Sequence, residues 1–142
     1  MQGGHETDFA KRWFVGAWLA LLGLKLWLAA RLPLFVDEAF YWQEGRHLAW
    51  AYSDLPGLTA WLARMGDELG DGTLALRLPF LAIAAVIPWL VVRMTAREFD
   101  ARSGWQAGSL TLLLPLAGTL GLLALPDVPL LLATLLCLDA GL

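Results

Sequence analysis

Three runs of apolar residues, each about as long as a membrane is thick, constrain the fold of this chain more than any other feature. They cover residues 13–32, 74–92 and 104–125, and a fourth apolar run extends over residues 128–142. A helix needs about 20 mostly apolar residues to cross a hydrocarbon layer of roughly 30 Å. The pattern therefore predicts an all-α fold of polytopic transmembrane helices, in a single region from residue 1 to residue 142.

The composition agrees with a membrane protein. Hydrophobic residues make up 58% of the 142 residues and charged residues 16%, whereas soluble domains are about 45–50% apolar and about 25% charged. A formal net charge of −3 offers no basic surface for phosphates, so we expect no nucleic acid among the partners. Since the fourth run is short for a span, we expect the chain to be the front portion of a longer protein.

The distribution of charge predicts which side each connection faces. Lys11 and Arg12 precede the first run, and three arginines lie in the connector at residues 93–103. The loop at residues 33–73 instead carries seven acidic residues against two arginines. By the positive-inside rule, the N-terminus and the connector face the cytoplasm and the long loop faces the outside.

The first run raises two questions: whether it is a signal peptide, and what its lysine does. A signal peptide is disfavoured because the run exceeds the usual apolar core of 7–15 residues, contains Lys25 and lacks a small-residue cleavage site. Lys25 either extends its ammonium toward the outer interface or contacts an anionic lipid headgroup.

The outer loop carries signals for two short helices. Asp37 is a candidate N-cap for a first helix, and Ser53 and Asp54 are candidates for the cap of a second. The second helix has an apolar stripe, and we expect that stripe to lie in the outer membrane interface. The stripe consists of Leu58, Leu62, Met65 and Leu69.

The adjacent carboxylates of Asp37 and Glu38 are the sharpest candidates for chemistry. A carboxylate at a membrane face can act as a general base on an acceptor hydroxyl, or it can bind a divalent cation that steadies a phosphate leaving group. The structural alternative is that Asp37 caps a helix and Glu38 is its solvated neighbour.

Three further residues have alternative readings. Asp54 and Asp127 are each either a helix cap or part of the wall of an outer cavity. Arg77, near the outer end of the second run, could extend to the interface, pair with a loop carboxylate or bind a phosphate. His5 and His47 lack the close partners of a metal site, and Cys137 in the last apolar run is expected to be a packing residue.

Several elements occur together in an order that resembles a known family. The chain reads Asp37-Glu38-Ala-Phe-Tyr41-Trp, then a segment ending Tyr-Ser-Asp54-Leu-Pro, then Gly-Asp-Gly before Arg77-Leu-Pro, and finally Pro-Asp127. This is similar to the N-terminal part of bacterial membrane glycosyltransferases of the protein O-mannosyltransferase and aminoarabinose transferase superfamily, which have the GT-C fold. Relatives commonly read Asp-His-Pro-Pro where this chain has Asp54-Leu-Pro-Gly, so the role of that histidine is absent here.

The resemblance implies an enzyme that takes a sugar from a polyprenyl-phosphate carrier and passes it to a glycan, lipid or protein acceptor. It implies a multi-pass protein of the bacterial inner membrane, with Asp37 as general base or metal-linked acid and Glu38 beside it. Asp54, Asp127 and Tyr41 would bind substrate, and Arg77 would lie near the donor phosphate. The cofactor stays unknown. A divalent cation is possible, because Asp37 as a metal-linked acid would bind one.

Two other classes remain as alternatives. The first is a small non-catalytic membrane protein, either a degenerate remnant or an assembly subunit, and an isolated chain of this size could itself be inactive. The second is a fragment of a transporter, which is weaker because the spans carry few polar residues at mid-membrane.

Overall fold

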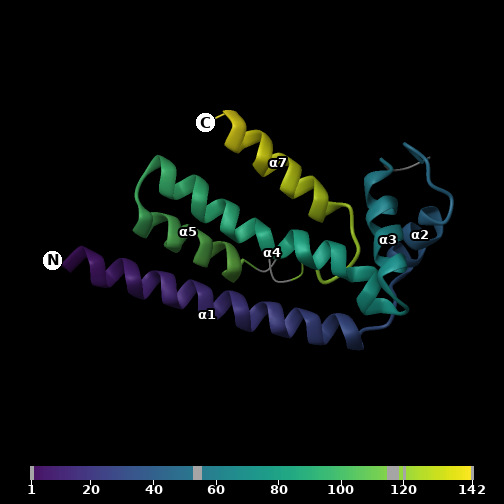
Figure 1. Ribbon diagram of the computed structural model, residues 1–142, viewed down its shortest axis with the longest axis horizontal. Coiled ribbons are helices and arrows are strands. Elements are labelled where there is room, and N and C mark those ends of the chain that lie inside the picture. The colour runs from purple at the N-terminus through teal and green to yellow at the C-terminus, as the bar shows by residue number, and fades with distance from the viewer. Residues whose placement is uncertain (1, 53–55, 115–118, 120, 142) are drawn as a thin grey trace.

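The computed structural model describes residues 2–52, 56–114, 119 and 121–141, and these residues form a helical bundle with a smaller helical cap at one end (Figure 1). The prediction of an all-α fold is confirmed, since the described residues contain no strand. The helices are α1 (Gln2–Arg31), α2 (Val36–Gly45), α3 (Leu58–Leu69), α4 (Thr73–Glu98), α5 (Ala101–Leu113) and α7 (Asp127–Gly141).

Helices α1, α4, α5 and α7 run lengthwise between two ends of the bundle, while α2 and α3 cover one of those ends (Figure 1). We call the end that carries α2 and α3 the loop end, and the end where α4 turns into α5 the connector end. At the connector end, Arg102 donates a hydrogen bond to Glu6, and Arg97 donates to the backbone carbonyl of Asp139 over 3.1 Å. The start of α1, the α4–α5 connector and the end of α7 therefore lie together.

Two described helices are long and apolar enough to cross a membrane. They cover His5–Arg31 and Thr73–Glu98, and the apolar 18-residue stretch within each has a mean hydropathy of 1.6 and 2.1, respectively. These correspond to the first two apolar runs, and each extends beyond the run toward the connector end. Which side of the membrane each end faces stays a prediction.

The third apolar run does not form one helix. We expected a span over residues 104–125, but α5 ends at Leu113 and residues 121–126 form turns. Leu114 is extended, with φ −65° and ψ 131°, because the ring of a following proline disfavours helical geometry in the residue before it, and residue 115 is a proline. The prediction of one continuous helix was therefore wrong. The 13 residues of α5 are only about 20 Å long, which is shorter than the hydrocarbon layer.

Glycines allow close helix contacts in the bundle. A Cβ atom at Gly104 would lie 2.7 Å from the Val92 carbonyl oxygen, and one at Gly108 would lie 2.3 Å from a Val92 methyl group. Gly121 has φ +76° and faces Ala84, which a Cβ atom would approach to 2.2 Å. These contacts bring α5 and the turn after it directly against α4.

At the loop end, small residues join α3 to its neighbours. A Cβ atom at Gly45 would lie 2.8 Å from the Ala60 carbonyl oxygen, and one at Gly66 would lie 2.6 Å from the Leu76 carbonyl oxygen. The apolar stripe expected on this helix instead points largely outward, since Met65 is 47% exposed and Leu69 is 63% exposed. Its contact with a membrane interface stays a prediction.

Both predicted caps lie elsewhere. Phe35, and not Asp37, is the N-cap of α2, and its backbone N–H is satisfied by the carboxylate of Glu38 at a distance of 3.1 Å. Gly57 is the N-cap of α3, which begins later than Ser53 and Asp54 would have started it. Those two residues lie outside the described part of the chain, so the prediction that Asp54 lines an outer cavity is not tested.

Candidate functional site

The centre of the loop end is a buried ion pair between Glu38 of α2 and Arg77 of α4. Both side chains are fully buried. The guanidinium donates from Nε to Glu38 Oε1 over 2.8 Å and from Nη2 to Glu38 Oε2 over 2.6 Å. This bidentate geometry joins the edges of the two planar groups and gives directional, charge-assisted bonds.

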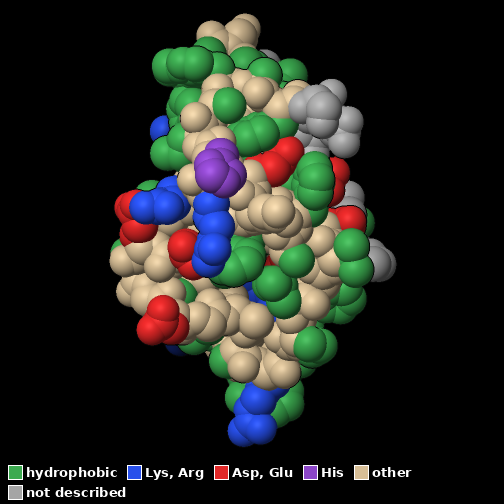
Figure 2. Space-filling model, turned by 90° about the vertical axis from the view of Figure 1, so that its right-hand side faces the viewer, with side chains coloured by type: hydrophobic (Ala, Val, Ile, Leu, Met, Phe, Trp, Pro, Cys, Tyr) green, Lys and Arg blue, Asp and Glu red, His purple; other side chains and the backbone are tan. Residues whose placement is uncertain are grey.

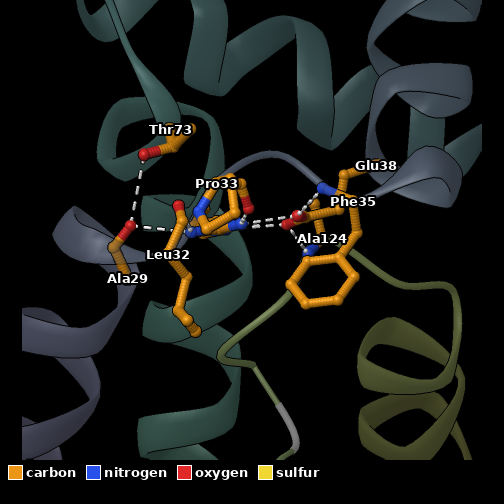
Figure 3. A network of polar contacts seen from close by, with 8 residues as sticks. Ala29, Leu32, Pro33, Phe35, Glu38, Thr73 and Ala124 are labelled. Carbon is orange, nitrogen blue, oxygen red and sulfur yellow. Dashed lines mark hydrogen bonds and ion pairs between the residues drawn. The ribbon is translucent and has the colours of Figure 1, made fainter.

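The remaining donors of Arg77 hold the end of α1. Nη1 donates to the backbone carbonyls of Ala29, at 2.8 Å, and Leu32, at 3.0 Å, while Nη2 donates to that of Pro33 at 2.8 Å. Figure 3 shows Ala29, Leu32, Pro33 and Glu38 close together in this network. Because a guanidinium has five N–H groups, every donor of Arg77 is used. Of the three roles considered for Arg77, pairing with a loop carboxylate is confirmed. The geometry leaves no donor for a phosphate.

Glu38 is equally occupied. Its Oε1 accepts from the backbone N–H of Ala124 at 2.8 Å, and its Oε2 accepts from that of Phe35 at 3.1 Å. Burial acts to raise the pKa of the Glu38 carboxyl, but the bonds from Arg77, Ala124 and Phe35 together hold that pKa below its usual value. Each carboxylate oxygen of Glu38 thus accepts two hydrogen bonds, and this arrangement favours a structural role over a catalytic one.

We call Glu38, Arg77 and their backbone partners the clamp. The clamp joins four segments: the end of α1, the start of α2, the second turn of α4 and the turns at residues 121–126. A buried charge without its partner is costly, so removing either side chain would release all four segments together. The clamp is what fixes the residues that flank it.

Asp37 differs completely from its neighbour Glu38. It lies in the first turn of α2, is exposed, and makes no hydrogen bond or ion pair with any described residue. Asp127 is also exposed, at the first residue of α7, three residues after the clamp contact at Ala124. Figure 2 looks onto this end of the molecule and shows acidic and basic side chains gathered among hydrophobic ones. The clamp thus holds two exposed carboxylates at the same end of the bundle.

Tyr41 is placed in the core. It is 9% exposed and clusters with Phe80, Ala84 and Val128, and its ring meets that of Phe40 edge-on with centroids 5.7 Å apart. Its contribution to substrate binding stays a prediction, one that this position favours less than a packing role.

The described residues that surround Asp37 do not form a metal-binding set. In the described parts, no three His, Cys, Asp or Glu side chains come together as a ligand set. Divalent cations in proteins take several oxygen or nitrogen ligands. We therefore derive no chemical step through a cation.

The structure contains a polar pocket at the loop end that was not predicted from the sequence. It is a cavity of about 420 Å³ whose polar lining includes Trp42, Arg46, Asp67 and Asp71. The arginine lies over the indole of Trp42 at 4.1 Å from the ring centroid. The spacing of Trp42 and Arg46, one helical turn apart, is the signal that could have found this pair.

These observations define a helical membrane protein with exposed carboxylates fixed at one end of its bundle by a buried charged clamp. Residues 54–140, more than half of the chain, match the family described as dolichyl-phosphate-mannose-protein mannosyltransferase. The chain belongs to this family of GT-C type glycosyltransferases, and the resemblance seen in the sequence is confirmed. The matched region includes Arg77 and Asp127 but begins after Asp37 and Glu38. No curated protein and no solved structure matches the chain.

Proposed function

We propose that this protein contributes the acceptor-activating part of a glycosyltransferase that moves a sugar from a polyprenyl-phosphate carrier to an acceptor at the outer membrane face. The family supports a mannosyltransferase-like activity. The single observation that carries the finer proposal is the contrast between the buried, fully bonded Glu38 and the exposed Asp37 beside it.

Asp37 acts as the general base. An acceptor hydroxyl attacks the anomeric carbon of the donor sugar while its proton passes to a carboxylate oxygen of Asp37. The bond between that carbon and the phosphate oxygen breaks, and the electron pair leaves with the polyprenyl phosphate. Attack opposite the leaving group inverts the configuration at the anomeric carbon. The step is a substitution and needs no oxidant or reductant.

The clamp supplies the positioning that this step requires. A reacting pair needs its geometry fixed closely, because small displacements of a catalytic group cost large factors in rate. Asp37 is the residue directly before Glu38, whose carboxylate is held by four hydrogen bonds. The backbone that carries the base is thereby anchored to α1 and α4. Asp127 lies at the same end and forms a second wall of the acceptor site.

The test is a transfer assay in membranes that contain the intact protein, with polyprenyl-phosphate-linked mannose as donor. We expect Asp37→Asn to lower the transfer rate by about 100-fold to 10,000-fold, since that is what positioned general bases contribute. The control is Asp8→Asn, which removes an exposed carboxylate from α1 near the connector end. It should transfer at the wild-type rate.

An Asp37→Asn protein that transfers mannose at the wild-type rate would refute the base assignment. A wild-type protein that transfers no sugar from any polyprenyl-phosphate donor would refute the proposed activity and would favour the non-catalytic alternative.

A further inference from the structure

The polar pocket at the loop end has no role in the step described above. Its walls come from three places in the chain: Trp42 and Arg46 at the end of α2, Asp67 near the end of α3, and Asp71 just before α4. Leu34 and Leu76 add apolar surface, and Gly72 and Thr73 complete the lining. We propose that this pocket binds a single pyranose ring, the glycosyl unit of the donor or of the acceptor. The inference rests on the proposed function and names the residues that hold the sugar.

The aromatic wall of the pocket is held in one orientation. The Trp42 Nε1 donates a hydrogen bond to Asp67 Oδ1 over 2.7 Å, which fixes the edge of the indole. Arg46 covers one ring face, with its guanidinium carbon 4.1 Å from the ring centroid. A cation over an aromatic face is held by the ring itself and needs none of its N–H donors. The two interactions therefore build a rigid wall before any ligand binds.

Donors and acceptors remain available on this wall. In the described part of the chain, the Arg46 guanidinium donates to no acceptor, and the exposed carboxylate of Asp71 accepts from no donor. Asp67 uses one carboxylate oxygen for Trp42. The pocket thus offers several N–H donors on one side and carboxylate oxygens on the other.

This combination selects hydroxyl groups over ions. A phosphate would meet the two carboxylates of Asp67 and Asp71, and an ammonium group would meet Arg46. A sugar hydroxyl both donates and accepts, so neighbouring hydroxyls can accept from Arg46 and donate to Asp71 at the same time. The apolar C–H face of the ring can lie on the side chains of Leu34 and Leu76. A lipid chain forms no hydrogen bonds with a charged lining, so it does not fit this pocket.

The size and place of the pocket agree with a single ring. A volume of about 420 Å³ is at the small end of the range for ligand sites, about 300–1,000 Å³. The pocket also borders the clamp, because Leu76 directly precedes Arg77 and Trp42 lies one helical turn after Glu38. A sugar bound there lies at the same end of the bundle as Asp37.

The binding test uses the purified intact protein in lipid nanodiscs and saturation-transfer NMR with methyl α-mannopyranoside. Mannitol, which carries hydroxyls but no ring, is the ligand control. We expect Asp71→Asn and Arg46→Met each to weaken binding about tenfold, since a hydrogen bond to a charged group contributes enough free energy for a factor of that size. Asp71→Asn is the decisive variant because Asp71 supports no described contact.

Arg31→Met is the matched control variant. Arg31 is an exposed arginine at the end of α1 whose guanidinium carbon lies 5.9 Å from the Trp27 ring centroid, and it does not line the pocket. It should bind methyl α-mannopyranoside like the wild type. Unchanged binding in both pocket variants, equal binding of mannitol, or no binding by the wild type would each overturn the proposal.

A competition arm distinguishes the two sources of the sugar. Displacement of methyl α-mannopyranoside by a short-chain polyprenyl-phosphate mannose supports the ring site as the place of the donor sugar, and simultaneous binding supports it as the place of an acceptor sugar. Because binding is read without transfer, a protein that binds the ring but transfers nothing would contradict the proposed function alone.

Discussion

The two ends of the bundle are stabilised by different kinds of interaction. Toward the connector end, aromatic rings pack on one another: Phe14 lies 5.0 Å from Trp89 and 5.5 Å from Trp105, measured between ring centroids. At the loop end, the central contact is the charged clamp of Glu38 and Arg77. Edge-to-face ring pairs add only about 0.5–1.5 kcal/mol beyond the area that they bury, and the charged hydrogen bonds of the connector end are exposed. The Arg77 guanidinium is instead buried, with all five of its donors bonded. The loop end, where the exposed carboxylates lie, is therefore the end whose geometry is specified by buried directional bonds.

Breaking the clamp should have the largest effect on stability. We expect Arg77→Met to lower the free energy of unfolding by about 3–5 kcal/mol, because it leaves the Glu38 carboxylate buried without its partner. The double variant Glu38→Leu/Arg77→Met should recover much of that loss, since an apolar pair buries no charge. Denaturant unfolding in micelles measures both. A single variant as stable as the wild type would show that the clamp is dispensable.

Crowding the bundle toward the connector end should have a smaller effect. Gly108→Ala places a methyl group 2.3 Å from Val92 and 2.8 Å from the Phe14 ring, and overpacking of this kind costs about 1–3 kcal/mol. Gly23→Ala is the matched control, because a Cβ atom there meets nothing within 4 Å. Thermal unfolding compares the two. We expect the transfer rate per folded molecule to be unchanged in both, and a large loss of rate in Gly108→Ala would erase the distinction between the ends.

Lowering the pH should have the smallest of the three effects on the stability of the folded protein. The pKa of Glu38 lies below its ordinary value, because the bonds from Arg77, Ala124 and Phe35 outweigh burial. The folded protein therefore binds this proton only at a lower pH than the unfolded chain does. The stabilisation is complete above the pKa of the unfolded chain and is lost as the pH falls through the lower folded pKa. Protonation leaves the side chain in place, unlike the loss of Arg77. Melting curves from pH 6 to pH 3 should fall more steeply for the wild type than for Glu38→Gln, and parallel curves would contradict this.

The sequence was sufficient for the parts of the fold that depend on long apolar runs. The helices α1 and α4 follow from the largely apolar runs at residues 13–32 and 74–92. The third run was misjudged because hydropathy is averaged over a window, while the break at Leu114 depends on the single proline that follows it. Local stereochemistry therefore decided where the helix ends.

The candidate site was predictable only in part, for a similar reason. The motif around Asp37 and Glu38 is visible in the sequence, but the division of roles between them depends on Arg77, which lies 39 residues after Glu38. No local pattern shows which of two adjacent carboxylates turns inward. The cap at Phe35 was missed because the cap is supplied by the Glu38 side chain and not by Phe35 itself.

The most direct test of this account compares Asp37→Asn with Glu38→Gln in one preparation, by transfer rate and by thermal unfolding. We predict that Asp37→Asn loses transfer about 100-fold or more and melts like the wild type, because its carboxylate supports no described contact. Glu38→Gln should melt at a lower temperature, because Arg77 loses its counter-charge. The opposite outcome, a destabilised Asp37→Asn that still transfers sugar and a stable Glu38→Gln, would contradict the division of roles between these two carboxylates.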